Sequence, residues 1–305
     1  MSVNSSNSSL HPHPHPSSLS LFNILLKCYR STAGSFTITA FTITSILFIL
    51  PLCILVLYLG HQRWRQQHSG AVISHSDLFT YHMVITELMN ILGFTLTCCG
   101  VLTDIPEMMM PGLYLSYINI SAQMFFHILT CVERYLAVVH PVTYLGLRKA
   151  RGIRIRNITI GCVWLLCFAA TGLMFIEDTM YNTIIAFCIA ALSLIIICFC
   201  SLSVLCVLSH PGPGEGGGSR QQVHQSKLRA FYTIMAILGV LLLRFGHSIL
   251  ATVLFTSLEE TGMCAIWFST PWFSLPSSLV LPVLFLHRAG KLPCCKNTES
   301  GQGSQ

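Results

Sequence analysis

Charged residues are scarce in this sequence. Only 9% of its 305 residues are Asp, Glu, Lys or Arg, whereas 53% are hydrophobic. A soluble domain carries roughly 25% charged residues, which cover its surface. The composition therefore argues against a soluble globular protein and favours an integral membrane protein.

The usual marks of an enzyme or a metalloprotein are also missing. Most of the 14 cysteines lie in apolar segments, where a cysteine behaves as a small apolar residue. No pair has partners at zinc-ligand spacing, and no nucleophile and base stand at a catalytic spacing. We therefore expect no enzymatic activity, no cofactor and no metal. The net charge of +6 is spread over several loops, so we expect no nucleic-acid partner.

Long hydrophobic runs, by contrast, are abundant. A membrane-spanning helix needs about 20 mostly apolar residues, and lipid leaves no partner for an open strand edge. Seven runs are long enough: 36–60, 78–102, 113–139, 158–175, 184–208, 228–254 and 263–286. The sequence predicts an all-α membrane protein with a seven-transmembrane helix bundle.

Lysine and arginine are concentrated on one side of these runs. Fourteen of the 17 fall there, while the opposite side has Lys27, Arg30 and six acidic residues. Positive residues stay in the cytoplasm, so we expect a multi-pass plasma-membrane protein with an extracellular N-terminus. The first run is too long and too far from Met1 for a cleaved signal peptide, and we interpret it as a signal anchor.

The domain organisation follows from these runs. Residues 1–35 are polar and Ser-rich, and we predict a disordered extracellular tail. Asn4 and Asn7 begin Asn-x-Ser acceptors for glycosylation in that tail. Residues 36–287 form the transmembrane domain, and residues 288–305 the cytoplasmic end.

The third run ends in Glu133-Arg134-Tyr135, followed by Pro141 and the basic segment 148–156. In this place the tripeptide resembles that of the rhodopsin-like (class A) G-protein-coupled receptors. The resemblance implies that Arg134 turns on activation to line a cleft for a heterotrimeric G protein, in response to an extracellular ligand. The alternative is a structural ion pair at a helix end. The basic segment would contact the G protein or the anionic membrane lipid of the inner leaflet.

Two more features extend the resemblance. Trp164 matches the single tryptophan of the family's fourth helix, which packs towards helices 2 and 3. Pro282 and Phe285 resemble the family's Asn-Pro-x-x-Tyr end of helix 7, with both polar members replaced. A short amphipathic helix 8 along the inner leaflet is implied next. Cys294 and Cys295 lie just beyond it beside basic residues, where we expect palmitoylation or, alternatively, unmodified thiols.

The chain departs from the family at its outer end. Neither the start of the third run nor the connection 176–183 has a cysteine, so the disulfide that most members form there is excluded. Some members instead tie the N-terminus to the start of helix 7, which here implies a Cys28–Cys264 disulfide. The adjacent Cys98 and Cys99 are competitors for that bond.

Two ionisable residues, Glu87 and Arg244, stand alone within apolar runs. Such a residue costs at least ~2.5 kcal/mol at membrane depth and should face the bundle interior. Glu87 lies where the family has an Asp that helps to hold sodium, so it either holds that ion or is protonated. Arg244 lies where the family has a Cys-Trp-x-Pro switch. It binds an anionic ligand or pairs with Glu87 in place of sodium, and we favour the pair because it offsets two desolvation costs.

The leading hypothesis is a receptor that activates a G protein through Glu133 and Arg134. The altered residues in helices 6 and 7 support a second hypothesis, a receptor-like protein that signals constitutively or only serves as a partner. A small transporter or channel is a third class, with Glu87 and Arg244 lining an ion path. The halves of the chain show no internal repeat that would favour it.

Overall fold

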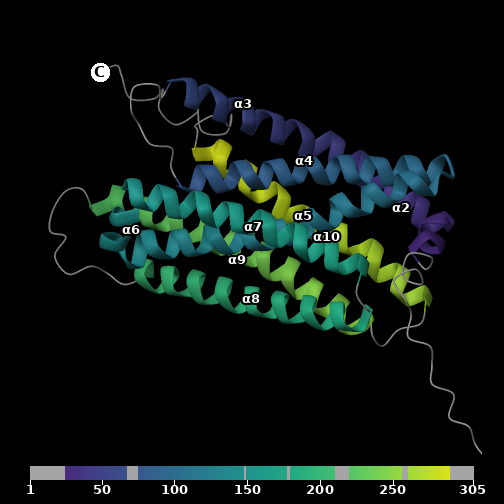
Figure 1. Cartoon of the computed structure of the whole chain (residues 1–305). Coiled ribbons are helices and arrows are strands. Elements are labelled where there is room, and N and C mark those ends of the chain that lie inside the picture. Colours follow the sequence, from purple (N-terminus) through teal and green to yellow (C-terminus); the bar gives the residue numbers. More distant parts are fainter. Residues whose placement is uncertain are drawn as a thin grey trace, which may run out of the picture.

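The computed structural model describes residues 25–66, 75–147, 149–176, 179–209, 220–255 and 260–288. Within these ranges every regular element is a helix (Figure 1). The elements are α2 (Thr32–Thr44), the π-helical turn η1 (Ser45–Ile49), α3 (Leu50–Gln66), α4 (His75–Leu102), α5 (Pro106–Val139), α6 (Pro141–Leu147), α7 (Ala150–Ile176), α8 (Thr179–Ser209), α9 (Arg220–Phe255) and α10 (Glu260–Arg288).

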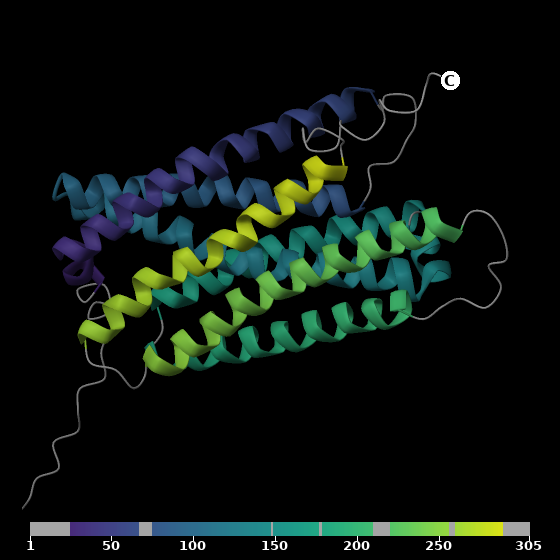
Figure 2. The same ribbon diagram turned by 180° about the vertical axis from the view of Figure 1, so that it is seen from behind.

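Seven helices are long and apolar enough to cross a membrane. The first is the continuous rod of α2, η1 and α3, and the others are α4, α5, α7, α8, α9 and α10. The rods run side by side in one bundle (Figures 1 and 2). The prediction of an all-α, seven-helix membrane fold is confirmed, and the chain is a multi-pass membrane protein.

The N-terminal boundary differs from the sequence prediction. Residues 25–30 are helical and α2 begins at Thr32, so the segment 25–35 is not part of a disordered tail. The side chain of Ser31 caps α2 by accepting a hydrogen bond from the Gly34 amide over 3.1 Å. Apolar packing of Leu25 and Tyr29 against the bundle explains why this polar-flanked stretch folds.

The first rod contains a local irregularity next to Pro51. A proline inside a helix lacks an N–H and its ring collides with the carbonyl four residues earlier. The π-helical turn Ser45–Ile49 lies just before it, and the Leu50 amide bonds to the Ser45 carbonyl. A single wide turn of this kind is a common way to absorb such a disturbance. The irregularity of the first rod next to Pro51 therefore takes the form of a π turn.

The backbones of α4 and α5 approach each other closely. A Cβ added at Gly112 would lie 2.3 Å from Thr97 Oγ1 and 2.6 Å from the Gly93 carbonyl oxygen. Small residues let membrane helices pack at such short range. The two glycines therefore set the position of α5, which runs through the bundle interior.

We expect Gly112→Ala to lower the melting temperature of the purified protein by several degrees. The added methyl forces α4 and α5 apart, and overpacking of this kind costs about 1–3 kcal/mol. Gly161→Ala is the matched control, since nothing lies within 4 Å of the Cβ it would add. Equal melting temperatures for the two variants would contradict the close approach.

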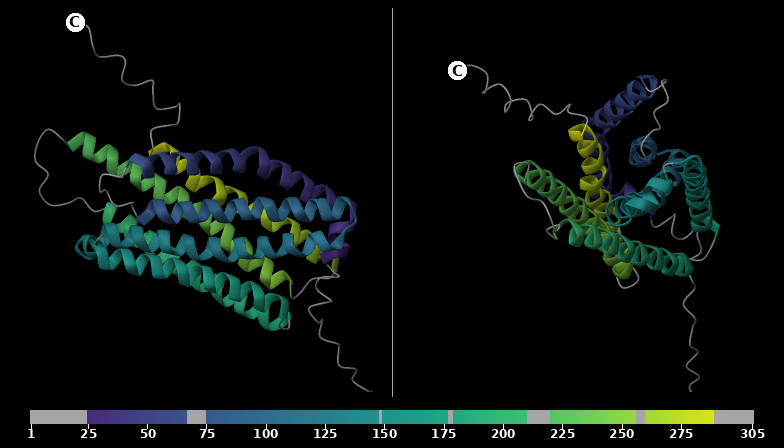
Figure 3. Two further views of the ribbon diagram at one scale, coloured as in Figure 1. Left: turned by 45° about the horizontal axis from the view of Figure 1, so that its top comes forward. Right: turned by 90° about the vertical axis from the view of Figure 1, so that its left-hand side faces the viewer.

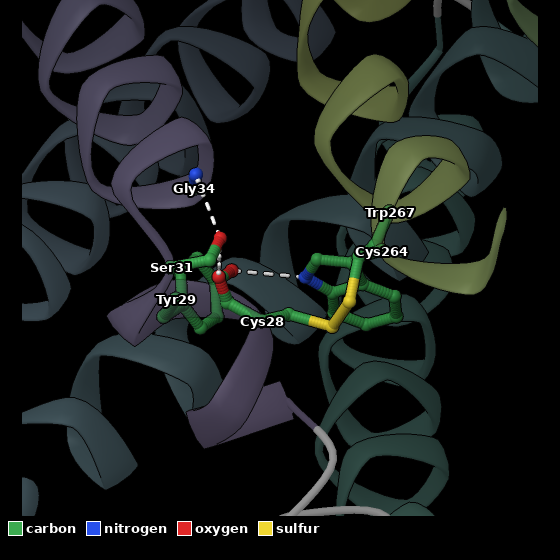
Figure 4. Close-up of a disulfide and its surroundings, with 6 residues drawn as sticks. All are labelled: Cys28, Tyr29, Ser31, Gly34, Cys264 and Trp267. Carbon is green, nitrogen blue, oxygen red and sulfur yellow. Dashed lines mark hydrogen bonds between the residues drawn. A yellow bond between two sulfur atoms is a disulfide. The ribbon is translucent and has the colours of Figure 1, made fainter. Parts of the chain in front are cut away.

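A disulfide joins the N-terminal segment to α10. Cys28 and Cys264 are bonded, with their Cα atoms 5.5 Å apart (Figure 4). This is the pair implied by the resemblance, and the competitors Cys98 and Cys99 are free thiols. Beside the bond, the Trp267 indole donates a hydrogen bond of 2.9 Å to the Tyr29 hydroxyl. Burial raises the pKa of Tyr29 to about 12, so this hydroxyl is neutral at physiological pH.

The bundle has two chemically different ends. One holds the disulfide, and we call it the disulfide end. The other holds the last turn of α3, the Glu133-Arg134-Tyr135 stretch and α6, and we call it the basic end. α10 crosses the bundle diagonally, from α2 at the disulfide end to α3 at the basic end (Figure 2).

Several predicted features lie outside the described residues. They are the glycosylation acceptors Asn4 and Asn7, the cysteines Cys294 and Cys295, and residues 289–305, which include most of the expected short helix. Glycosylation, palmitoylation and helix 8 therefore stay predictions.

Candidate functional site

A polar cluster occupies the middle of the bundle. Glu87 on α4, Gln123 on α5, Arg244 on α9 and Ser277 on α10 are all buried, with exposed fractions of 2%, 2%, 8% and 2%. Each lies on an apolar helix surrounded by lipid or by other helices. Because lipid offers no hydrogen-bond partner, the polar side chain must face the other helices. Four helices thus converge on one polar site.

The cluster is held together by a chain of hydrogen bonds. Arg244 Nη1 donates to Gln123 Oε1 over 2.9 Å and to Ser277 Oγ over 2.8 Å. The amide nitrogen of Gln123 in turn donates to Glu87 Oε1. Only one orientation of the Gln123 amide serves both neighbours, because its oxygen must face the cation and its NH₂ the carboxylate. We call this chain the Arg244–Gln123–Glu87 relay.

Glu87 and Arg244, which the sequence predicts to pair, act on each other electrostatically, but a neutral side chain separates them. Both side chains face the interior as expected, but the ion pairs of the described residues do not include one between them. Gln123 stands between the two charges. A neutral amide spans the gap by presenting an acceptor at one end and a donor at the other.

Gln123 is the residue that sequence reasoning missed. It carried a usable signal, because it is a polar side chain within an apolar run. It also lies four residues before His127 and eleven before Arg134, on the same face of α5. A neutral amide does not require a partner of opposite charge, so its position alone does not predict that it bridges Glu87 and Arg244.

The second oxygen of Glu87 has different surroundings. Oε2 is buried and accepts no hydrogen bond of normal geometry from the described residues, although Asn90 and Ser278 border the carboxylate. A cation placed beside it would be repelled by the guanidinium of Arg244 at the other end of the relay. The geometry thus favours Arg244 over a sodium ion as the positive charge of this site.

The basic end holds the Glu133-Arg134-Tyr135 stretch. The Tyr144 hydroxyl on α6 donates to Glu133 Oε1 over 3.2 Å, and Arg156 on α7 acts on the same carboxylate electrostatically. The Tyr135 hydroxyl lies 3.2 Å from His140 Nε2. Glu133 is therefore held by the two helices that follow it.

Arg134 lines a small cavity between three helices. His127 and Cys131 line it from α5, Cys200 and Ser201 from α8, and Ile234, Ile237 and Leu241 from α9. The cavity has a volume of about 20 Å³, which is room for about one water molecule. His127, Cys131 and Arg134 share this cavity because their i, i+4, i+7 spacing places them on one face of α5. The space beside Arg134 is too small for a protein helix in this conformation.

Trp164 ties α7 to the centre of the bundle. Its indole donates to His82 Nδ1 on α4 over 3.3 Å, and its ring meets Phe126 of α5 at 6.1 Å. This is the packing towards helices 2 and 3 that the resemblance implied. Trp164 therefore packs α7 against α4 and α5.

The end of α10 is apolar where the family has a polar pair. Pro282 and Phe285 are both buried, and the Phe285 ring meets Tyr81 at 5.8 Å. The guanidinium of Arg63 lies over the same ring, 5.1 Å from its centroid. Packing, rather than a hydrogen-bond network, therefore joins α10 to α3 and α4 at the basic end.

Comparisons with known proteins do not assign a family. No protein-family model matches the chain, and no curated protein matches it either. Among the described residues, no group of three or more His, Cys, Asp or Glu side chains could hold a metal ion. What the site does is therefore inferred from the relay and the basic end.

Proposed function

We propose that this chain is a G-protein-coupled receptor of the plasma membrane, with its N-terminus outside and the basic end in the cytoplasm. It passes the binding of an extracellular ligand to a heterotrimeric G protein. The observation that carries this proposal is the position of Arg134, which lines a cavity between α5, α8 and α9 at the basic end. A small movement of α9 would turn that cavity into a cleft with Arg134 on its wall.

The relay supplies the bistable element that such a receptor needs. It ties α9 to α5 and α10 through Arg244, and α5 to α4 through Gln123. A ligand shifts a two-state equilibrium only by binding the two states with different affinity. A movement of α9 breaks or re-forms the bonds of Arg244, so the relay couples the middle of the bundle to the cavity beside Arg134.

One experiment tests the signalling role directly. We expect Arg134→Ala to reduce nucleotide exchange on co-expressed G proteins by about tenfold or more, within the range of measured coupling energies. Basal exchange in membranes is the readout, so that no ligand needs to be known. Arg65→Ala is the control, because Arg65 is an exposed cation of the basic end outside the segment 148–156. If Arg134→Ala supported nucleotide exchange at the wild-type rate, at matched surface expression, the proposed role of Arg134 would be contradicted.

A receptor that signals without a ligand is the second candidate. The segment 25–30 packs over the disulfide end through Leu25 and Tyr29, and Cys28 holds it to α10. A segment of the chain itself thus covers part of the surface through which an extracellular ligand would enter. High basal exchange that depends on Arg134 and does not rise with any ligand would favour this candidate.

A further inference from the structure

A buried histidine lines the cavity beside Arg134. His127 is 2% exposed, and its Nε2 atom has no hydrogen-bond partner among the described residues. A buried polar group that is left unpaired costs about 1–3 kcal/mol. The ring of His127 therefore calls for a partner that these residues do not supply, and the cavity is the space in which such a partner can lie.

The size of the cavity restricts what that partner can be. A cavity needs a volume of about 10–15 Å³ to hold one water molecule. The volume here is about 20 Å³, which leaves no room for an organic ligand. An ion would have to shed its hydration shell to enter, and that costs far more than the burial of a neutral water. A cation would also be repelled by the guanidinium of Arg134.

The wall of the cavity offers further hydrogen-bonding groups. Ser201 and Thr130 both line it, and a hydroxyl has one donor and two acceptor positions. The Thr130 hydroxyl donates to the Phe126 carbonyl oxygen over 2.8 Å, and its oxygen can still accept. An internal water makes about three hydrogen bonds to buried polar groups, whereas a purely apolar cavity stays dry. This cavity is polar enough to hold a water in place.

Ser201 brings a second helix to the site. α8 packs against α5 and against α9 along the bundle (Figure 3). The Ser201 side chain is buried and borders the thiol of Cys131, which lies one helical turn after His127. The hydroxyl of α8 and the imidazole of α5 thus face the same small space.

We propose that this cavity is a water-binding site, in which one water molecule bridges Nε2 of His127 on α5 to the hydroxyl of Ser201 on α8. The water donates to the ring nitrogen in one tautomer of His127 and accepts from it in the other. Gln123, His127 and Arg134 follow one another on one face of α5, so the water extends the polar contacts of the relay towards Arg134. The site needs only the packing of α5 against α8, and it does not depend on the proposed signalling role.

Radiolytic footprinting of the purified full-length chain in detergent tests the proposal. A short X-ray pulse splits water into hydroxyl radicals, and a bound water oxidises the side chains that touch it, which mass spectrometry then locates. Cys131 lines the cavity and is 7% exposed, and Cys98, at 8%, is a matched control outside it. We expect Cys131 to be oxidised at least about threefold faster than Cys98, because an internal water lies against it. Equal rates in the wild-type chain would overturn the water site.

Two substitutions of His127 test its role as the partner of the water. His127→Leu removes the ring nitrogen and should slow the oxidation of Cys131 to the rate of Cys98. His127→Gln keeps a donor and an acceptor and should preserve the faster rate. Rapid oxidation of Cys131 in His127→Leu would overturn the assignment of His127. The comparison of Cys131 with Cys98 is made on the wild-type chain, so it decides the proposal even if a variant fails to fold, and it is independent of any G-protein signal.

Discussion

Replacing Arg244 with methionine should lower the melting temperature of the protein more than any other single change in the relay. The substitution leaves Gln123 Oε1 and Ser277 Oγ without their donor, and it leaves the buried Glu87 without a positive charge nearby. Removing one partner from a buried charged network costs about 3–5 kcal/mol. Methionine keeps most of the side-chain volume, so the loss reports electrostatics and hydrogen bonding rather than a cavity.

A double-mutant cycle measures whether Gln123 transmits this effect. Glu87→Gln in the Arg244→Met background should restore part of the lost stability, with a coupling of about 1 kcal/mol or more between the two sites. In a Gln123→Leu background that coupling should fall towards zero, because the relay is broken. Thermal melting of the detergent-solubilised single and double variants gives the stability changes from which the coupling is calculated. Strict additivity of the Glu87 and Arg244 changes would show that the relay does not connect them.

The second large effect concerns the disulfide end. Cys28→Ser should destabilise the protein by about 2–4 kcal/mol, the usual contribution of a native disulfide. The bond closes a loop of 236 residues in sequence, and long loops gain most in the chain-entropy account. Loss of the bond also frees the segment that positions Tyr29 against Trp267. Melting temperature with and without reductant is the measurement.

The effect of reductant on two variants separates the role of the disulfide from that of other thiols. Reductant should lower the melting temperature of the wild-type protein and leave that of Cys28→Ser unchanged. Cys98→Ser removes a free, buried thiol and should keep the sensitivity to reductant. A wild-type protein indifferent to reductant, together with a Cys28→Ser variant of wild-type stability, would mean that the disulfide has no stabilising role.

Much of this fold could be predicted from the sequence because the helices lie in lipid rather than in water. Lipid cannot hydrogen-bond a backbone, so an apolar run of sufficient length must be a helix. The seven spans therefore follow from the length and position of the apolar runs. Glu87 and Arg244 could likewise be assigned to the interior, because an isolated charge cannot face lipid. The arrangement of lysine and arginine predicts the side of the membrane on which each end lies.

The contacts between those helices were decided only by the tertiary structure. Two buried charges predict a pair, but the rotation and separation of α4 and α9 set the distance between them, and Gln123 of α5 fills it. The sequence likewise left the partner of Cys28 to resemblance, and the folded segment 25–30 brings it to Cys264. The cavity beside Arg134 also depends on the packing of several helices. Hydrophobicity acts on each helix by itself, whereas a relay or a cavity exists only where several helices meet.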